Sequence, residues 1–171
     1  MTVPPGTPMA SHAARREEIA QKLYIDIPVP RWSDPKIIVR YRPLTQAEVT
    51  EAGEAVKRAG SKTKAEAALS ANIKGLVKSC VGIYALFGDE TYSLDADDPE
   101  KWLPFDPDTD EPEWMRFDDV LGAALGVEEK SAAAVCRTLF HTEGDLLGHA
   151  AELAVFSGFS DQKIDEEFSG E

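Results

Sequence analysis

The chain has 171 residues and a mass of 18.7 kDa, and its hydrophobic fraction of 43% is enough for one domain with a core. Its net charge of −13 argues against general binding to DNA or RNA, because an acidic protein repels phosphate backbones. Two distant cysteines exclude a disulfide framework, and no apolar stretch reaches the roughly 18 residues of a membrane span.

Charge and proline divide the chain unevenly. Residues 1–86 carry a net charge of +5 and residues 87–171 a net charge of −18. All 11 prolines lie at or before Pro112, which suits a run of helices in the remaining residues. We therefore predict a mainly α protein: a compact helical domain with a small N-terminal β-hairpin element and an acidic, Pro-rich connector.

The N-terminal part predicts an arm followed by two strands. Residues 1–22 start with a Pro/Gly/Thr-rich stretch and end in a short helix, so we expect a flexible arm. Residues 23–29 alternate apolar and polar side chains, and residues 36–41 are β-branched. These two strands open the second part, 23–94, which also contains two helices.

Two capping boxes mark those helices. Thr45 with Glu48 predicts a helix over 46–59, and Thr63 with Glu66 predicts a longer one over 63–86. The longer segment has apolar residues in steps of three and four, which is typical of an amphipathic helix.

Residues 95–117 are dense in Asp, Glu and Pro and predict an extended acidic linker. The pattern of residues 118–171 predicts a C-terminal helical segment within the same single domain. Its helices are expected over 118–125, 131–140, 143–157 and 161–168. The core is expected to consist of Leu69, Ile73, Leu76, Val77, Cys80, Val135, Leu139, Leu146, Leu147 and Leu153.

Two clusters, one acidic and one containing histidines, have residue types that bind metals. Asp106, Asp108 and Asp110 alternate as calcium ligands do, but the glycine and glutamate that a calcium loop needs later are missing. His141, Glu143, Asp145 and His149 lie within nine residues, yet they do not converge on one helix face as zinc ligands would. A surface pair between Asp145 and His149, or partly buried imidazoles, is the favoured interpretation of the second cluster.

No motif predicts catalysis. Cys80 and Cys136 lie in apolar helical settings and are expected to be core residues and not nucleophiles. The chain has no Gly-rich phosphate loop, no Ser-His-Asp context and no HExxH motif. We therefore expect a protein that is not an enzyme and has no cofactor.

Aromatic and basic residues in the connectors have two interpretations each. Trp32, Trp102 and Trp114 either pin their connectors to the body, which is favoured, or offer anchors to a partner. The cluster of Arg31, Arg40 and Arg42 is either a solvated strand face or a dock for the acidic linker.

Several stretches together resemble a known family. They are YRPLT at Tyr41–Thr45, ANIKGLVKSCVGIYA at 71–85, RFDDVLGAALG at 116–126 and VCRTLFHTEGDLLGHAAELAVFSGF at 135–159. The chain from about residue 37 to residue 171 looks like the tail assembly chaperones of long-tailed (siphovirus-type) bacteriophages, in particular those of actinobacteria. The stretch 135–161 is the most telling part.

The resemblance implies a non-enzymatic role. Such chaperones bind the long, helix-rich tape measure protein, keep it soluble while tail tube subunits polymerise around it, and then leave. It implies the tape measure protein, the tail tube protein and a frameshifted longer form of the chain as partners, with no nucleic acid and no membrane. It also implies a location in the host cytoplasm and not in the mature virion, and the lack of a signal sequence agrees with this expectation.

Two other function classes remain open. One is a structural tail or head–tail connector subunit of a phage. The other is an acidic inhibitor or nucleic-acid mimic, although a mimic should space its carboxylates over a folded face and not gather them in a linker.

The last twelve residues, 160–171, predict a partner-binding surface. Ile164 and Phe168 are four apart on one helix face, and an eight-residue helix needs either the body or a partner to hold it. A partner anchor with an acidic rim is slightly favoured over docking on the body. The acidic rim consists of Asp161, Asp165, Glu166 and Glu167.

Overall fold

The computed structural model describes residues 12–60, 63–109 and 114–159. Its strands are β1 Ile25–Pro28, β2 Lys36–Tyr41, β3 Cys80–Phe87, β4 Glu90–Asp95 and β5 Asp98–Pro104. Its helices are α2 His12–Lys22, α3 Gln46–Arg58, α4 Lys64–Ser79, α5 Asp119–Leu125, α6 Ala132–Leu139 and α7 Glu143–Phe156.

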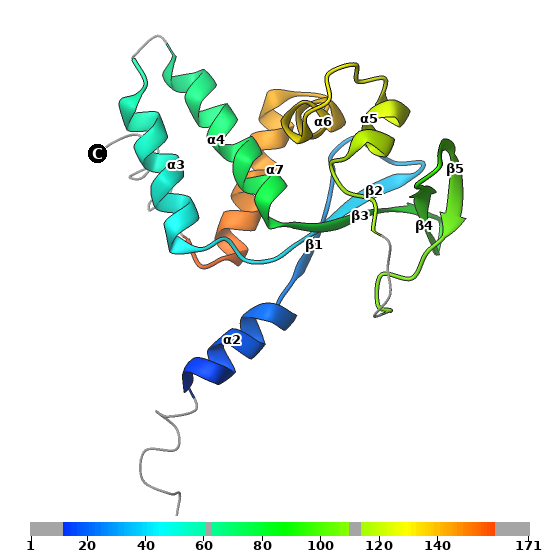
Figure 1. The fold of residues 1–171 in the computed structure, drawn as a ribbon, viewed down its shortest axis with the longest axis horizontal. Coiled ribbons are helices and arrows are strands. Elements are labelled where there is room, and N and C mark those ends of the chain that lie inside the picture. Colours follow the sequence, from blue (N-terminus) through cyan, green and yellow to red (C-terminus); the bar gives the residue numbers. More distant parts are fainter. Residues whose placement is uncertain (1–11, 61–62, 110–113, 160–171) are drawn as a thin grey trace, which may run out of the picture.

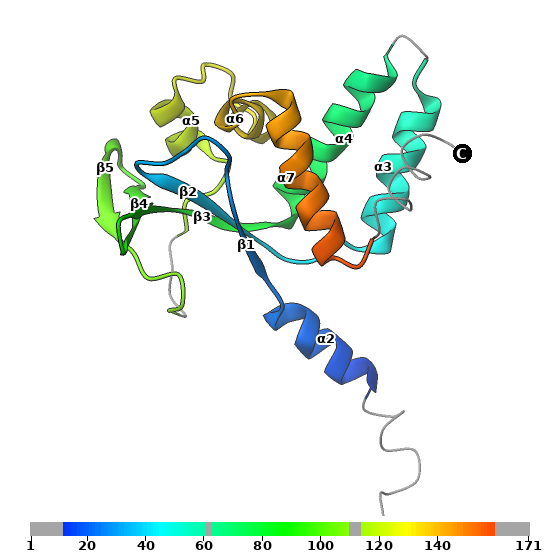
Figure 2. The ribbon, with the colours of Figure 1, turned by 180° about the vertical axis from the view of Figure 1, so that it is seen from behind.

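The fold is a mixed α/β domain built on one five-stranded antiparallel sheet in the order β1-β2-β3-β4-β5. Helices α5, α6 and α7 lie over one side of the sheet (Figures 1 and 2). α4 packs against α6 and α7, and α3 packs on the outer side of α4. α2 projects from the start of β1, away from the other helices (Figure 1).

The prediction of a mainly α, all-helical protein is therefore wrong, and the expected helix over 63–86 is the main cause. The helix ends at Ser79, and the next eight residues form β3, which pairs with β2 on one side and β4 on the other. Residues 80–87 are almost all apolar, so their sequence fits both a buried helix and a buried strand. Pairing with two neighbouring strands decides between them.

The expected linker over 95–117 is also partly wrong. It contains β5, which pairs with β4 and forms one edge of the sheet. Pro99 and Pro104 fit there because an edge strand leaves one row of backbone amides unpaired. The charged residues of β5 protect this edge from pairing with another chain.

Most of the other expected helices are confirmed. The helices over 46–59, 118–125, 131–140 and 143–157 agree with α3, α5, α6 and α7 to within one residue at each end. Side-chain caps start all four: Thr45, Asp118, Ser131 and Thr142 each accept a hydrogen bond from the third backbone amide that follows. The helix expected over 161–168 lies outside the described residues.

The apolar face of the sheet and the helices above it form the main core. Ile27, Val39 and Ile83 are at most 1% exposed and share this core with residues of α4, α6 and α7. Of the ten predicted core residues, seven are buried, whereas Val77 and Cys80 are half-buried and Leu147 is 40% exposed. The prediction that Leu147 is a core residue is wrong because α7 also has an apolar surface outside the main core.

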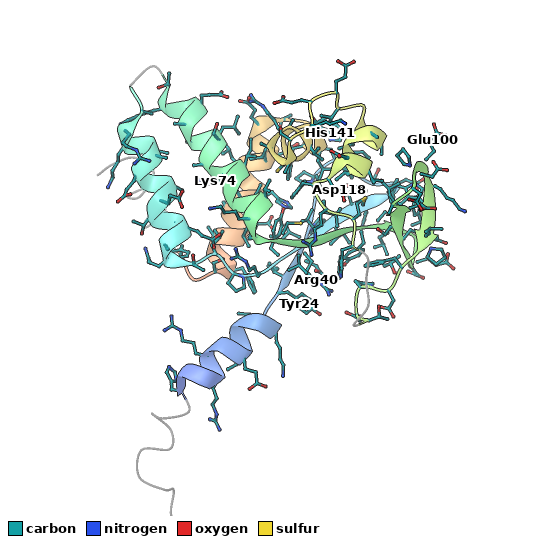
Figure 3. The ribbon with its side chains drawn as sticks, viewed as in Figure 1. Tyr24, Arg40, Lys74, Glu100, Asp118 and His141 are labelled. Carbon is teal, nitrogen blue, oxygen red and sulfur yellow. The ribbon has the colours of Figure 1, made fainter. Side chains whose placement is uncertain are left out.

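The opposite face of the sheet carries a buried arginine. Arg40 forms a two-pronged ion pair with Asp26, at 2.7 and 3.0 Å, and its guanidinium lies 3.7 Å from the Tyr24 ring centroid (Figure 3). It also donates to the Pro107 carbonyl at 2.8 Å and lies 3.6 Å from an Asp108 carboxylate oxygen. Arg40 therefore binds the acidic connector. This agrees with one of the two interpretations of the basic cluster, in which it binds the acidic linker.

Gly82 gives a second contact between this face and the connector. A Cβ placed on Gly82 would lie 2.2 Å from the Trp114 ring, so only glycine fits beneath that indole. The Trp114 ring also packs against Phe105, with centroids 4.8 Å apart.

We expect Gly82→Ala to lower the free energy of unfolding by about 1–3 kcal/mol, because Trp114 must move or the strand must bend. Urea denaturation measures this change. Gly148→Ala is the matched control: its site in α7 has open space, so alanine should stabilise the helix by up to about 1 kcal/mol. If Gly82→Ala is as stable as the parent, Trp114 does not seal this face.

Candidate functional site

A half-open groove of about 320 Å³ lies between α3, α4 and α7. We call it the α3–α4–α7 groove. Alanines make up much of its lining, namely Ala52, Ala55, Ala68, Ala71, Ala150, Ala151 and Ala154. Leu44, Val49, Leu76, Leu147 and Leu153 add larger apolar side chains. Its size is at the lower end of the range of about 300–1,000 Å³ for binding pockets, and suits a few apolar side chains.

The segment between β2 and α3 holds the groove open at one end. Thr45 and Glu48 form the predicted capping box, with Thr45 Oγ1 accepting from the Glu48 amide at 3.2 Å and Glu48 Oε1 accepting from the Thr45 amide at 3.0 Å. Glu48 also forms a two-pronged ion pair with Arg42, at 2.8 and 3.0 Å. The hydrogen bonds from Arg42 lower the pKa of Glu48 to about 2.

The same segment joins α3 to the ends of the other two helices. Arg42 Nη2 donates to the Lys78 carbonyl near the end of α4, at 3.2 Å. The Leu44 amide donates to Ser157 Oγ after α7, at 2.7 Å. The stretch Tyr41–Thr45, which marked the family resemblance, is thus the structural joint that sets the positions of the groove walls.

Basic side chains lie along the rim of the groove. Lys74 lies on α4 (Figure 3). It pairs with Glu51 on α3 at 2.8 Å, and Lys78 approaches the same carboxylate at 3.9 Å. Lys74 makes the largest contribution to a lowered pKa of Glu51, and Arg58 also acts in this direction. Because Arg42 neutralises Glu48, the cations of the rim outnumber its unpaired carboxylates.

The lining of the groove is mostly apolar, and its charged side chains come from Glu48, Glu51, Arg58, Lys74 and Lys78. Its lining has no histidine, cysteine, serine or tyrosine that could act as a nucleophile or proton carrier. Elsewhere, burial raises the pKa of the Cys80 thiol to about 12 and raises that of Cys136 further, so both remain protonated at neutral pH. Cys136 is thus a core residue, as expected, and Cys80 packs half-buried against the same core.

The structure places the described members of the two candidate metal clusters in other contacts. Within the described residues, no group of three or more His, Cys, Asp or Glu side chains is placed to bind a metal ion. Asp106 accepts from the Asp108 amide in a tight turn, Asp108 faces Arg40, and Asp110 lies outside the described residues. The calcium pattern is thus part of a turn.

The histidine cluster is divided among separate contacts. Asp145 pairs with Arg31 at 2.6 Å, and Glu143 pairs with Arg137 at 2.8 Å. His149 is 2% exposed, and its Nε2 lies 2.6 Å from the Tyr41 hydroxyl. Of the two favoured interpretations, the surface pair between Asp145 and His149 is wrong, because Asp145 pairs with Arg31 in the β1–β2 connection. The buried imidazole of His149 agrees with the other interpretation.

The three tryptophans pack against the body of the domain: Trp32 and Trp114 lie in connectors, whereas Trp102 lies in β5. Trp32 Nε1 donates to the Leu139 carbonyl at 2.9 Å, and the Trp102 ring packs on Phe87 with centroids 5.7 Å apart. Trp114 covers Gly82, as described above. The favoured interpretation, a connector pinned to the body, agrees with the contacts of Trp32 and Trp114, but Trp102 belongs to a strand of the sheet.

Sequence reasoning missed the groove and placed the candidate site elsewhere. The six predicted partner-binding residues, Ile164, Phe168, Asp161, Asp165, Glu166 and Glu167, lie outside the described residues, so that prediction stays untested. A signal for the groove was present: Ala52 and Ala55 on α3, and Ala68 and Ala71 on α4, are each three apart and share a helix face.

Comparisons of the chain with protein-family models, with curated proteins and with solved structures find no match. Among the helices of the described residues, none combines the length and the apolar character needed to cross a bilayer.

Proposed function

We propose that the protein is a phage tail assembly chaperone that binds helical segments of a tape measure protein and keeps them soluble. The α3–α4–α7 groove is the observation that supports this proposal best. Grooves between helices commonly bind the apolar face of an amphipathic helix, using a few side chains at helical spacing. The tape measure protein is expected to be helix-rich, so it can offer such faces repeatedly.

The lining of the groove suits this role. Alanine side chains let a partner helix come close to α3 and α4 without displacing bulky groups. The lining is mostly apolar, with its charged side chains at the rim, and an assembly chaperone needs no reactive group. The net charge of −18 in residues 87–171 would help keep a complex with an apolar partner in solution.

A charge placed in the groove should abolish solubilisation of the tape measure protein. Ala71→Glu puts a carboxylate among apolar walls, and burying it against a partner helix is unfavourable. We expect the soluble fraction of co-expressed tape measure protein to fall to the level seen without the chaperone. Ala65→Glu is the control, because Ala65 is exposed near the start of the same helix and is not part of the lining.

Thermal melting of both variants separates binding from folding. The proposal requires Ala71→Glu to remain folded and yet fail to solubilise, while Ala65→Glu solubilises like the parent. Equal solubilisation by all three proteins would reject the groove as the partner site. A protein that remains in purified virions would instead support the structural-subunit alternative.

A further inference from the structure

We propose that residues 160–171 of the same chain occupy the α3–α4–α7 groove and mask it until a partner displaces them. Under this proposal, residues 160–171 regulate access of the partner to the groove, and this regulatory part rests on the proposed function. The occupancy itself depends only on the groove and on the sequence that follows α7.

The first argument is where the chain leaves α7. Phe159 is 7% exposed and belongs to a small buried cluster with Val49 and Ala154, both of which line the groove. The Phe159 amide donates to the Ala154 carbonyl at 2.9 Å, after Gly158 has turned the backbone with a φ of 95°. Phe159, the last described residue, therefore lies beside the part of the groove formed by α3 and α7.

The second argument is reach. Twelve residues follow Phe159, which span about 18 Å as a helix or up to roughly 40 Å when extended. α3 has 13 residues and is therefore about 20 Å long. The segment can run along the groove wall in either conformation.

The third argument is chemical fit. Ile164 and Phe168 are four apart, so a helical segment places both on one face, and a groove of about 320 Å³ suits two such side chains. The segment also contains five acidic residues and one lysine. Arg58, Lys74 and Lys78 on the groove lining complement that charge.

Photocrosslinking in the full chain tests the occupancy directly. With p-benzoylphenylalanine in place of Phe168, we expect irradiation of a dilute solution to crosslink the residue to α3, α4 or α7 of the same molecule, as mapped by mass spectrometry. The same probe in place of Tyr24 is the control, because Tyr24 lies beside Arg40 on the opposite side of the sheet (Figure 3). Crosslinks from position 168 that avoid the groove, or that form only between molecules, would overturn the proposal.

A binding assay measures the masking without any tape measure protein. The probe is the anionic, apolar dye 1-anilinonaphthalene-8-sulfonate, which suits an apolar groove with a basic rim. If the masked form is about 90% populated, the double substitution Ile164→Asp and Phe168→Asp should raise dye affinity about tenfold. Gln162→Asp, which changes charge without removing an apolar side chain, should leave the affinity close to that of the parent. Adding Ala71→Glu to the double variant should remove the gain.

The outcomes separate this proposal from the proposed function. Crosslinks to the groove and a gain in dye binding, in a chain that never solubilises a tape measure protein, would keep the masking and reject the chaperone role. Unchanged dye affinity in the double variant would reject the masking. Loss of tape measure solubilisation by the double variant would also reject the masking. That result would mean that residues 160–171 bind the partner and do not compete with it.

Discussion

Ile73→Ala should lower the free energy of unfolding by about 2–5 kcal/mol. Ile73 lies on α4, is 5% exposed and belongs to the main core cluster with residues of the sheet, α6 and α7. Its truncation leaves a cavity at the point where α4 packs on the rest of the domain, and the surrounding elements can collapse only partly. Urea denaturation followed by circular dichroism measures the change.

Leu147→Ala is the control for this prediction. Leu147 is apolar, belongs to a helix and was predicted to be in the core, but it is 40% exposed. Its truncation should therefore cost less than about 1 kcal/mol. Equal losses for the two variants would mean that α4 and α7 do not present these faces.

The second large effect concerns acid sensitivity. Burial lowers the pKa of His149 from 6.5 to about 4, and the nearby Pro28 carbonyl only partly opposes this shift. Between these two values the unfolded chain binds the proton more readily than the folded protein does. Stability is therefore fully present above pH 6.5 and falls as the pH approaches 4, by on the order of 3 kcal/mol.

Removal of the titrating group tests this assignment. His149→Gln keeps an acceptor for the Tyr41 hydroxyl but cannot gain a proton, so the fall in stability between pH 6.5 and pH 4 should become shallower. His141→Gln is the control, because His141 is exposed and stacks near Trp32. Unfolding measured at several pH values gives the slopes. If the slope of His149→Gln equals that of the parent, another group causes the acid sensitivity.

Local signals in the sequence placed most helices correctly. The capping residue Thr45 with Glu48 fixes the start of α3, and Gly126 with a φ of 75° ends α5. These signals are reliable because each depends on hydrogen bonds between residues a few positions apart. Thr63 shows their limit: its hydroxyl bonds to the Gly60 carbonyl and does not cap α4, although the same pattern is present.

The sequence by itself determined the helix starts, the separation of charge and the aromatic pins, because these depend on neighbouring residues or on composition. Only the tertiary structure decided that residues 80–87 are a strand, since an apolar run takes the conformation that its neighbours pair with. It also decided that His149 faces Tyr41 from more than a hundred residues away. The α3–α4–α7 groove is likewise a product of the tertiary structure. Each of its walls is an ordinary alanine-containing helix, and the groove forms because contacts at Arg42 and Leu44 hold the three helices together.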